Sequence, residues 1–334
     1  MLFRSRLLAG DARLAEVQVS ITHGAGIAIA SAALEMPDPD DLPLPAPEAV
    51  CLPGRPVDAH KGTFGTVVVV AGSLGFTGAA YLSATAAARA GAGLVRLLVA
   101  QGIYPVLATK CTEVMATPVQ EVGPGAVGHS AQTAIMRHLE ASSVGLVGPG
   151  LGRDRSTWRL VLDLVAGAAL PLVLDADALN ALADNRKALP RVAKRGARVM
   201  TPHPGEMGRL LGRPTSEVQA ERHEWAMAAA QEWGAVVVLK GSHTVVAAPD
   251  GSLSEDPHEV PALATGGTGD VLAGVIAGLI AQGLEPFEAA VTGVYVHAEA
   301  GRRIAGRLGD SGLLASDLLL EVPLVMQLLR KGGL

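Results

Sequence analysis

The sequence predicts an α/β protein in which helices cover a mostly parallel β-sheet. From residue 66 onward, short apolar runs rich in β-branched residues alternate with longer helical stretches. The runs are apolar at successive positions, as in strands buried on both faces of a parallel sheet. The segments between them are long enough for the crossover connections that parallel strands require.

Six runs account for the predicted sheet, and a seventh adds a hairpin arm at its edge. The six lie at Thr66–Ala71, Leu94–Ala100, Val144–Val147, Pro171–Leu174, Ala197–Met200 and Ala235–Leu239. The seventh, His243–Ala248, precedes Pro249-Asp250-Gly251, a turn sequence that suits a hairpin. Aromatic residues make up only 3% of a chain with 40 glycines. Ala, Val and Leu must therefore fill the core, and we expect closely packed layers.

The chain divides into an N-terminal segment, residues 1–56, and a large domain, residues 57–334. Residues 36–56 are rich in Pro and Asp, a composition that favours an extended linker. Before them, residues 15–22 alternate polar and apolar side chains like a strand. Fewer than about 40 residues seldom fold alone, so we expect this segment to dock on the large domain or to remain loose.

Charge, cysteine content and hydropathy exclude several classes of protein. The net charge is −5 and the basic residues are scattered, so no basic stripe is available to bind nucleic acid. Cys51 and Cys111 are too few for a disulfide framework or a zinc site and favour a reducing compartment. Asp11 and Arg13 interrupt the N-terminal apolar patch, and no run reaches the roughly 18 residues of a membrane span. We expect a cytoplasmic protein that does not bind membranes.

Polar clusters directly follow the predicted strands. In open parallel sheets, ligands bind at the carboxyl ends of the strands, so these clusters are expected to form one site. They comprise Gly72-Ser73, Gly148–Gly152, Asp175–Asn180, Thr201–Glu206 and Lys240–Thr244.

The strongest single signal is the glycine-rich sequence at 264–274, which leads into a helix predicted to reach about Gln282. Amides around Gly267 and Gly269, at the positive end of that helix, are suited to hold a phosphate. A carboxylate beside them, Asp270, suits a base that takes a proton from a hydroxyl attacking a phosphoryl group. Alternatively, Asp270 caps the helix and the glycines form a plain turn.

A second glycine-rich loop, Gly148-Pro-Gly-Leu-Gly152, is suited to a large anionic ligand, although it could equally be structural. It matches neither the dinucleotide fingerprint nor a Walker A loop, which argues against hydride transfer. Lys240 follows a strand and could meet nucleotide phosphates. Lys61, in His60-Lys-Gly-Thr-Phe-Gly65, offers another cation or a solvated side chain.

Several side chains at the strand ends could hold a metal or a ligand. Asp175 and Asp177 carry the oxygen ligands that Mg²⁺ prefers, although Asp177 could instead cap a helix from Ala178. His203 and Glu206 lack the spacing of a zinc site. A ligand contact is expected for His203, and an N-terminal or metal-linked role for Glu206.

Taken together, six motifs resemble the NAD(P)H-hydrate dehydratase family over about 270 residues from His60 onward. They are His60-Lys-Gly-Thr-Phe-Gly, Gly148-Pro-Gly-Leu-Gly, Asp175-Ala-Asp-Ala-Leu-Asn, Thr201-Pro-His-Pro-Gly-Glu, Lys240-Gly-Ser-His-Thr and Gly266-Gly-Thr-Gly-Asp. The resemblance implies a ribokinase-like three-layer α/β/α fold. It also implies ADP-dependent return of (S)-NAD(P)H hydrate to NAD(P)H, with release of AMP and phosphate.

The resemblance also assigns roles to residues. Asp270 would be the base, and the amides of Gly267 and Gly269 would stabilise the transferred phosphoryl group. The hydrated dinucleotide would contact Ala79, Gly150, Gly152, His203 and Asp270. The adenine nucleotide would be held by Lys240, Gly241, Ser242, His243, Thr244 and Gly269. Magnesium would bridge its phosphates, and relatives are commonly homotetramers.

Two other functions stay open. A ribokinase-like vitamin-precursor kinase shares the Gly-X-Gly-Asp arrangement and would release a phosphorylated product. A regulatory module that binds nucleotide without turnover has no need of a base at Asp270. Residues 10–19 are similar to the closing strand of the epimerase domain that precedes this domain in many bacteria, but no epimerase activity is expected because the rest of that domain is absent.

Overall fold

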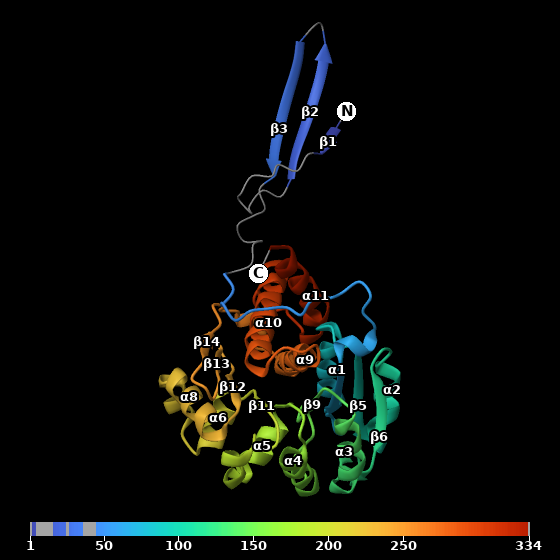
Figure 1. Ribbon diagram of the computed structural model, residues 1–334, viewed down its shortest axis with the longest axis vertical. Coiled ribbons are helices and arrows are strands. Elements are labelled where there is room, and N and C mark those ends of the chain that lie inside the picture. Colours follow the sequence, from blue (N-terminus) through green and yellow to red (C-terminus); the bar gives the residue numbers. More distant parts are fainter. Residues whose placement is uncertain (1, 5–15, 25–26, 36–44, 333–334) are drawn as a thin grey trace.

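The computed structural model describes residues 2–4, 16–24, 27–35 and 45–332. The first three ranges form β1 (Leu2–Arg4), β2 (Glu16–Gly24) and β3 (Ile27–Glu35), which pair antiparallel in their own sheet (Figure 1). The strand expected at 15–22 is confirmed from residue 16. Residues 36–44 of the predicted linker lie outside the described residues.

The main sheet has nine strands in the order β14-β13-β12-β11-β10-β9-β4-β5-β6. All pairs from β12 to β6 are parallel, and β13 and β14 form the antiparallel edge. The strands are β4 (Thr66–Val70), β5 (Leu94–Ala100), β6 (Met115–Val119), β9 (Val144–Val147), β10 (Leu172–Leu174), β11 (Arg198–Met200), β12 (Val236–Leu239), β13 (Val245–Ala247) and β14 (Leu253–Glu255). The predicted mostly parallel sheet and its seven runs are thus confirmed, while β6 and β14 were not predicted. Two short strands, β7 (Glu121–Val122) and β8 (Ala126–Val127), form a separate hairpin.

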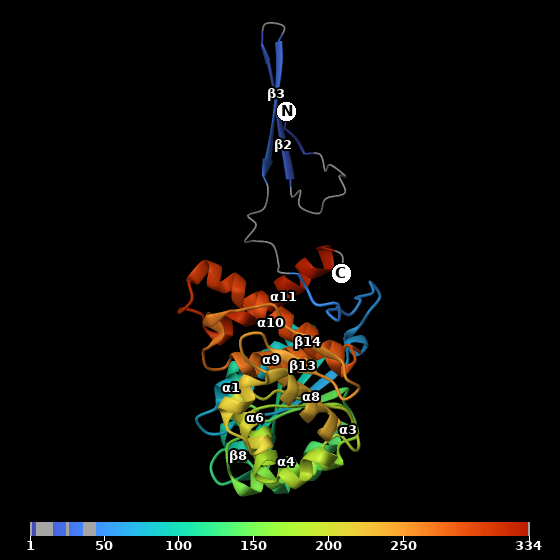
Figure 2. The ribbon, with the colours of Figure 1, turned by 90° about the vertical axis from the view of Figure 1, so that its left-hand side faces the viewer.

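Helices cover both faces of this sheet and give three layers. Figures 1 and 2 show α1, α9, α10 and α11 on one face and α3, α4 and α5 on the other. The helices are α1 (Thr77–Arg89), α2 (Tyr104–Lys110), α3 (Gln132–Glu140), α4 (Arg155–Gly167), α5 (Asp177–Asp184), α6 (Pro204–Leu211), α7 (Thr215–Ala220), α8 (Arg222–Trp233), α9 (Thr268–Ala281), α10 (Pro286–Leu308) and α11 (Ala315–Gly332).

Helices α1 and α9 pack closely because glycines of α9 face the backbone of α1. A Cβ atom on Gly274 would lie 2.2 Å from the carbonyl oxygen of Ser83, and one on Gly278 would lie 2.6 Å from that of Ala87. No side chain fits at either position without displacing a helix. This packing fixes α9 against the sheet, and so fixes the glycine-rich turn from which it starts.

The segment that precedes the main sheet lies against α10. The amide of Cys51 donates to Thr292 Oγ1 at 3.0 Å, and that hydroxyl donates to the Cys51 carbonyl at 3.0 Å. Val50 beside them is buried. Cys51 and Cys111 are both free thiols. Within the described ranges, no helix has the length and apolar character needed to cross a bilayer.

Candidate active site

The polar clusters meet where the strand order reverses. The chain runs outward from β4 through β5 to β6 and then returns to β9 on the other side of β4. Open parallel sheets bind ligands at such a reversal, beyond the carboxyl ends of the strands. The Gly72 amide donates to the Pro149 carbonyl at 2.8 Å, and Ser73 Oγ donates to the Gly150 carbonyl at 2.8 Å. These bonds join the two loops at the edge of the site.

The Gly148–Gly152 loop also packs tightly on its neighbours. Gly148 has φ 129°, and a Cβ there would lie 1.8 Å from the Asp175 carbonyl oxygen. Gly150 has φ 61°, and a Cβ there would lie 2.9 Å from the Cβ of Ala79 on α1. Gly148 and Gly150 are therefore required for the packing of this loop, and Gly150 lies beside Ala79.

Asp177 holds the same loop from α5. Its Oδ2 accepts from the Gly152 amide at 2.8 Å, and its Oδ1 accepts from Asn180 Nδ2 at 3.1 Å. The helix begins at Asp177 and not at Ala178, so Asp177 is not the helix cap. The residue before it, Ala176, has φ 49°, a strained conformation for a residue with a side chain.

Lys240 links the ends of three strands through two carboxylates. Its Nζ lies 2.8 Å from Asp175 Oδ1 and 4.0 Å from Glu206 Oε2. Asp175, which is 1% exposed, also accepts from Thr201 Oγ1 at 2.7 Å. Burial by itself lowers the pKa of Lys240, but the two carboxylates outweigh it and raise the pKa. The ammonium therefore stays charged in the site.

Asp270 lies in the first turn of α9, beside Lys240. The helix cap is Gly267, at φ 95°, so the alternative that Asp270 is the cap is wrong. A Cβ atom on Gly269 would lie 3.3 Å from Lys240 Nζ, and one on Gly267 would lie 3.8 Å from Asp270 Oδ2. Burial, followed by repulsion from Asp175, raises the pKa of Asp270 to about 7, although Lys240 opposes the rise. A carboxylate with this pKa can accept a proton near neutral pH.

His297, which sequence reasoning missed, supports the start of α9 from α10. Its Nε2 donates to the Thr268 carbonyl at 2.9 Å. Burial lowers the pKa of His297 to about 4, so it is neutral at physiological pH. Its position inside a helix, without a neighbouring motif, gave no signal in the sequence.

His203 caps α6. Its Nδ1 accepts from the Gly205 amide at 3.0 Å and the Glu206 amide at 3.4 Å, while Glu206 Oε2 accepts from the His203 amide at 2.9 Å. This reciprocal capping box gives both residues a structural role. The His203 side chain is nevertheless 51% exposed, so its ring can also meet a ligand.

The candidate metal ligands do not fit a divalent ion bound directly by protein. Asp175, Asp177 and Glu206 each already accept hydrogen bonds from protein donors. The ammonium of Lys240 lies between Asp175 and Glu206 and supplies positive charge there. In the part of the chain that the structure describes, no group of three or more His, Cys, Asp or Glu residues could hold a metal.

A cavity of about 440 Å³ opens beside Lys240 and the start of α9. Four residues of the Lys240–Thr244 motif line it, namely Lys240, Gly241, Ser242 and Thr244, together with Gly269. His243 does not line it, because its ring contacts Glu259 Oε1 at 2.9 Å and the Asp256 carbonyl at 3.1 Å. Apolar residues from 260–264, α9 and α10 complete a wall suited to a nucleoside.

A buried charged network supports this cavity, and the sequence did not reveal it. His258, which is 3% exposed, contacts Asp256 Oδ1 through Nδ1 and Glu299 Oε2 through Nε2, each at 3.0 Å. Burial lowers the pKa of His258, but bonds to the two carboxylates raise it overall to about 9. Lys61, by contrast, is exposed and precedes β4, at the opposite end of the strands from the site.

Comparison with known proteins places these features in one family. A bifunctional NAD(P)H-hydrate repair enzyme of Moorella thermoacetica is 46% identical over 276 residues, which cover 83% of this chain and 52% of the relative. The chain thus spans about half the length of that relative. An ADP-dependent (S)-NAD(P)H-hydrate dehydratase of Xanthomonas campestris is 38% identical, with 85% of this chain and 96% of the relative covered.

Solved structures of similar fold agree with these sequence comparisons. An ADP/ATP-dependent NAD(P)H-hydrate dehydratase of Bacillus subtilis, co-crystallised with ATP/Mg²⁺, aligns with a TM-score of 0.69 and 32% identity over 83% of this chain and 94% of its own. A ribokinase-like superfamily protein of Enterococcus faecalis aligns with a TM-score of 0.71 and 27% identity over 83% and 91%. The predicted ribokinase-like fold is confirmed. The NAD(P)H-hydrate dehydratase family model matches residues 67–324, and the chain belongs to that family.

Proposed function

We propose that the protein dehydrates (S)-NAD(P)H hydrate in a reaction that uses ADP and yields NAD(P)H, AMP and phosphate. The observation that carries the proposal is Asp270, a carboxylate with a pKa of about 7 beside Lys240 and the glycine-lined start of α9. The activities of the Xanthomonas and Bacillus relatives support it. Hydride transfer needs no such base beside a phosphate-binding helix end.

In the first step, Asp270 takes the proton of the added hydroxyl group. The hydroxyl oxygen bonds to the terminal phosphorus of ADP, and the bond from that phosphorus to the bridging oxygen breaks, which releases AMP. Amides around Gly267 and Gly269 stabilise the charge on the transferred group, helped by the positive end of α9. Lys240 adds a fixed positive charge at the same place.

In the second step, the phosphate ester is eliminated. The carbon–oxygen bond breaks, a proton leaves the neighbouring ring carbon, and the double bond of the reduced nicotinamide is restored. Phosphate is a far better leaving group than hydroxide, which is the chemical reason for the phosphorylation. The net change removes the elements of water from the hydrate and transfers them to the phosphoanhydride bond of ADP.

Two regions flank the reacting centre. We assign ADP to the 440 Å³ cavity beside Gly269 and the Lys240–Thr244 motif. We assign the hydrated nicotinamide to the region around Ala79, Gly150, Gly152 and His203, with Asp270 between the two ligands. His203 acts there through its exposed ring edge.

Magnesium, when bound, would neutralise charge on the phosphates of the nucleotide. The carboxylates that could reach it are already bonded within the protein, so we assign it no protein ligand.

We further propose that residues 57–334 form the catalytic domain. The protein acts in the cytoplasm, where its cofactor substrates are, and it binds no nucleic acid.

We also propose that the protein is a homo-oligomer, with a tetramer as the form we expect. Helix α11 carries exposed leucines at 320, 324 and 328, which favour contact with a second copy of the chain.

The test is recovery of reduced nicotinamide absorbance. Purified protein is incubated with heat-hydrated NADH, Mg²⁺ and ADP, and absorbance, AMP and phosphate are followed together. We expect recovery that requires ADP, with one AMP and one phosphate formed per NADH. Consumption of ATP with a vitamin-precursor alcohol, without any recovery, would contradict the proposal and indicate a kinase.

The role of His203 needs a variant that preserves the helix cap. Asparagine caps helices well, so His203→Asn keeps the α6 start while removing the imidazole, whereas His203→Ala removes both. We expect His203→Asn to raise KM for the hydrate without changing stability. An unchanged KM would remove His203 from the substrate contacts.

A further inference from the structure

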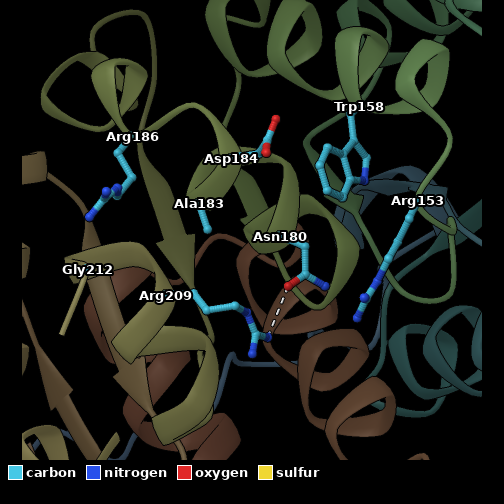
Figure 3. A pocket seen from close by; sticks show the side chains of 8 residues that line it. All are labelled: Arg153, Trp158, Asn180, Ala183, Asp184, Arg186, Arg209 and Gly212. Carbon is cyan, nitrogen blue, oxygen red and sulfur yellow. Dashed lines mark hydrogen bonds between the residues drawn. The ribbon is translucent and has the colours of Figure 1, made fainter. Parts of the chain in front are cut away.

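We infer that an arginine-lined hollow beside the active site binds phosphate groups of the adenosine half of the hydrated dinucleotide. The inference rests on the proposed function and extends it to the part of the substrate that does not react. The hollow has a volume of about 380 Å³ (Figure 3). It is lined by Arg153, Trp158, Asn180, Ala183, Asp184, Arg186, Arg209 and Gly212.

The arginines of this hollow come from three separate parts of the chain. Arg153 precedes α4, Arg186 follows α5, and Arg209 lies on α6. Figure 3 shows Arg153 and Arg209 extending toward the region below Asn180, whereas Arg186 extends away from them on the side of Gly212. All three side chains are exposed. Three guanidinium groups and one carboxylate, Asp184, give the hollow a net positive charge.

These guanidinium groups remain available to a ligand. Among the described residues, none of the three forms an ion pair within 4.0 Å, and the hydrogen bond of Arg209 goes to the uncharged Oδ1 of Asn180 at 3.0 Å. Guanidinium groups present planar pairs of donors that match phosphate oxygens. Like charges around one hollow repel one another, and a bound anion would relieve that repulsion. The expected ligand is therefore a phosphate ester or diphosphate.

The hollow adjoins the proposed nicotinamide site. Asn180, which lines it, bonds to Asp177, which holds the amide of Gly152. Trp158 Nε1 donates to the carbonyl of the same Gly152 at 3.3 Å. Arg209 follows His203 by six residues along α6, or about 9 Å at the usual helical rise. These contacts place the hollow beside Gly152 and within one helix of His203, where the far half of a ligand bound at Gly150 and His203 is expected to lie.

The hollow is also distinct from the cavity assigned to ADP, since the two share no lining residue. In that assignment the phosphates of ADP lie at the Gly269 end of its own cavity, so none of them would reach the arginines. A dinucleotide, by contrast, carries a diphosphate beyond its reacting ring, and NADPH carries a further 2′-phosphate. Trp158 adds a flat apolar wall against which an adenine could lie.

The test is the double variant Arg153→Gln with Arg186→Gln, assayed at saturating ADP with both hydrates. Arg209 is left intact because it bonds to Asn180. We expect KM to rise at least tenfold while kcat changes less than twofold. A rise in KM for both hydrates assigns the hollow to the diphosphate, and a rise in KM for NADPH hydrate alone assigns it to the 2′-phosphate. Arg137→Gln, an exposed arginine of α3, is the matched control.

An unchanged KM for both hydrates, in a protein whose wild type turns them over, would overturn the inference. A wild type without turnover would instead refute the proposed function. In that case the hollow is tested separately by calorimetric titration with inorganic diphosphate at saturating ADP. The affinity for diphosphate must be at least tenfold lower in the double variant than in the wild type, and equal affinities of the two proteins would overturn the inference.

Discussion

Replacing Asp270 by asparagine should slow turnover by about a hundredfold or more and at the same time stabilise the protein. The carboxyl group has a pKa of about 7 in the folded protein and 3.8 as its ordinary value. A carboxyl whose pKa is raised by folding binds its proton more tightly in the folded state. Stability is therefore lost as pH rises from the ordinary pKa toward the folded one, and Asp270→Asn avoids this loss because it cannot ionise.

The size of the effect follows from the two pKa values. Each unit of difference corresponds to about 1.36 kcal/mol, so ionising Asp270 costs about 4 kcal/mol of unfolding free energy at pH 8. At pH 5 only the unfolded chain is largely ionised, and the cost is about 1.7 kcal/mol. The variant should therefore gain about 2.5 kcal/mol more over the wild type at pH 8 than at pH 5.

Urea denaturation at the two pH values measures this difference, with Asp310→Asn in an exposed turn as the control. Turnover of the hydrate should fall on the order of a hundredfold or more, the usual effect of losing a general base, while both ligands still bind. An equal gain in stability at both pH values would contradict the conclusion that burial and repulsion raise the pKa of Asp270. Near-normal turnover would refute its role as a base.

Three other changes test Lys240, the charged network of His258 and the packing of α9. Lys240→Ala leaves buried carboxylates unpaired and should cost about 3 to 5 kcal/mol in urea denaturation, partly restored by Lys240→Arg. The folded pKa of His258 is raised to about 9, so the stabilising effect of its charge should be complete below about pH 6.5 and lost as pH rises through 9. The difference in unfolding free energy between wild type and His258→Gln should therefore be smaller at pH 10 than at pH 6, and an equal difference would contradict this account. Gly274→Ala places a Cβ 2.2 Å from a backbone oxygen of α1 and should lower the unfolding free energy by about 1 to 3 kcal/mol. The control Gly306→Ala, on α10 with no atom within 4 Å of the new Cβ, should not lower the unfolding free energy. Equal effects of the two substitutions would contradict the close packing of α9 on α1.

Strands with buried apolar runs were predictable, and edge strands were not. β4 and β12 are buried along nearly their whole length, so hydrophobicity alone reveals them. β6 contains Pro118 and is mostly exposed or half-buried, and β14 is likewise exposed. An edge strand needs apolar residues on fewer positions and tolerates proline, so its sequence differs little from a loop.

The sequence by itself determined the fold class, the family and the motifs that meet at the strand ends, because buried strands and phosphate-binding turns each require particular residues at fixed spacings. Only the tertiary structure decided what the polar side chains of those motifs do. It paired Lys240 with Asp175 and Glu206, made His203 a helix cap, and added His297 and His258 from segments without a motif. These roles depend on distances between residues far apart in the chain, and the pKa of Asp270 depends on burial and on charges brought together by folding.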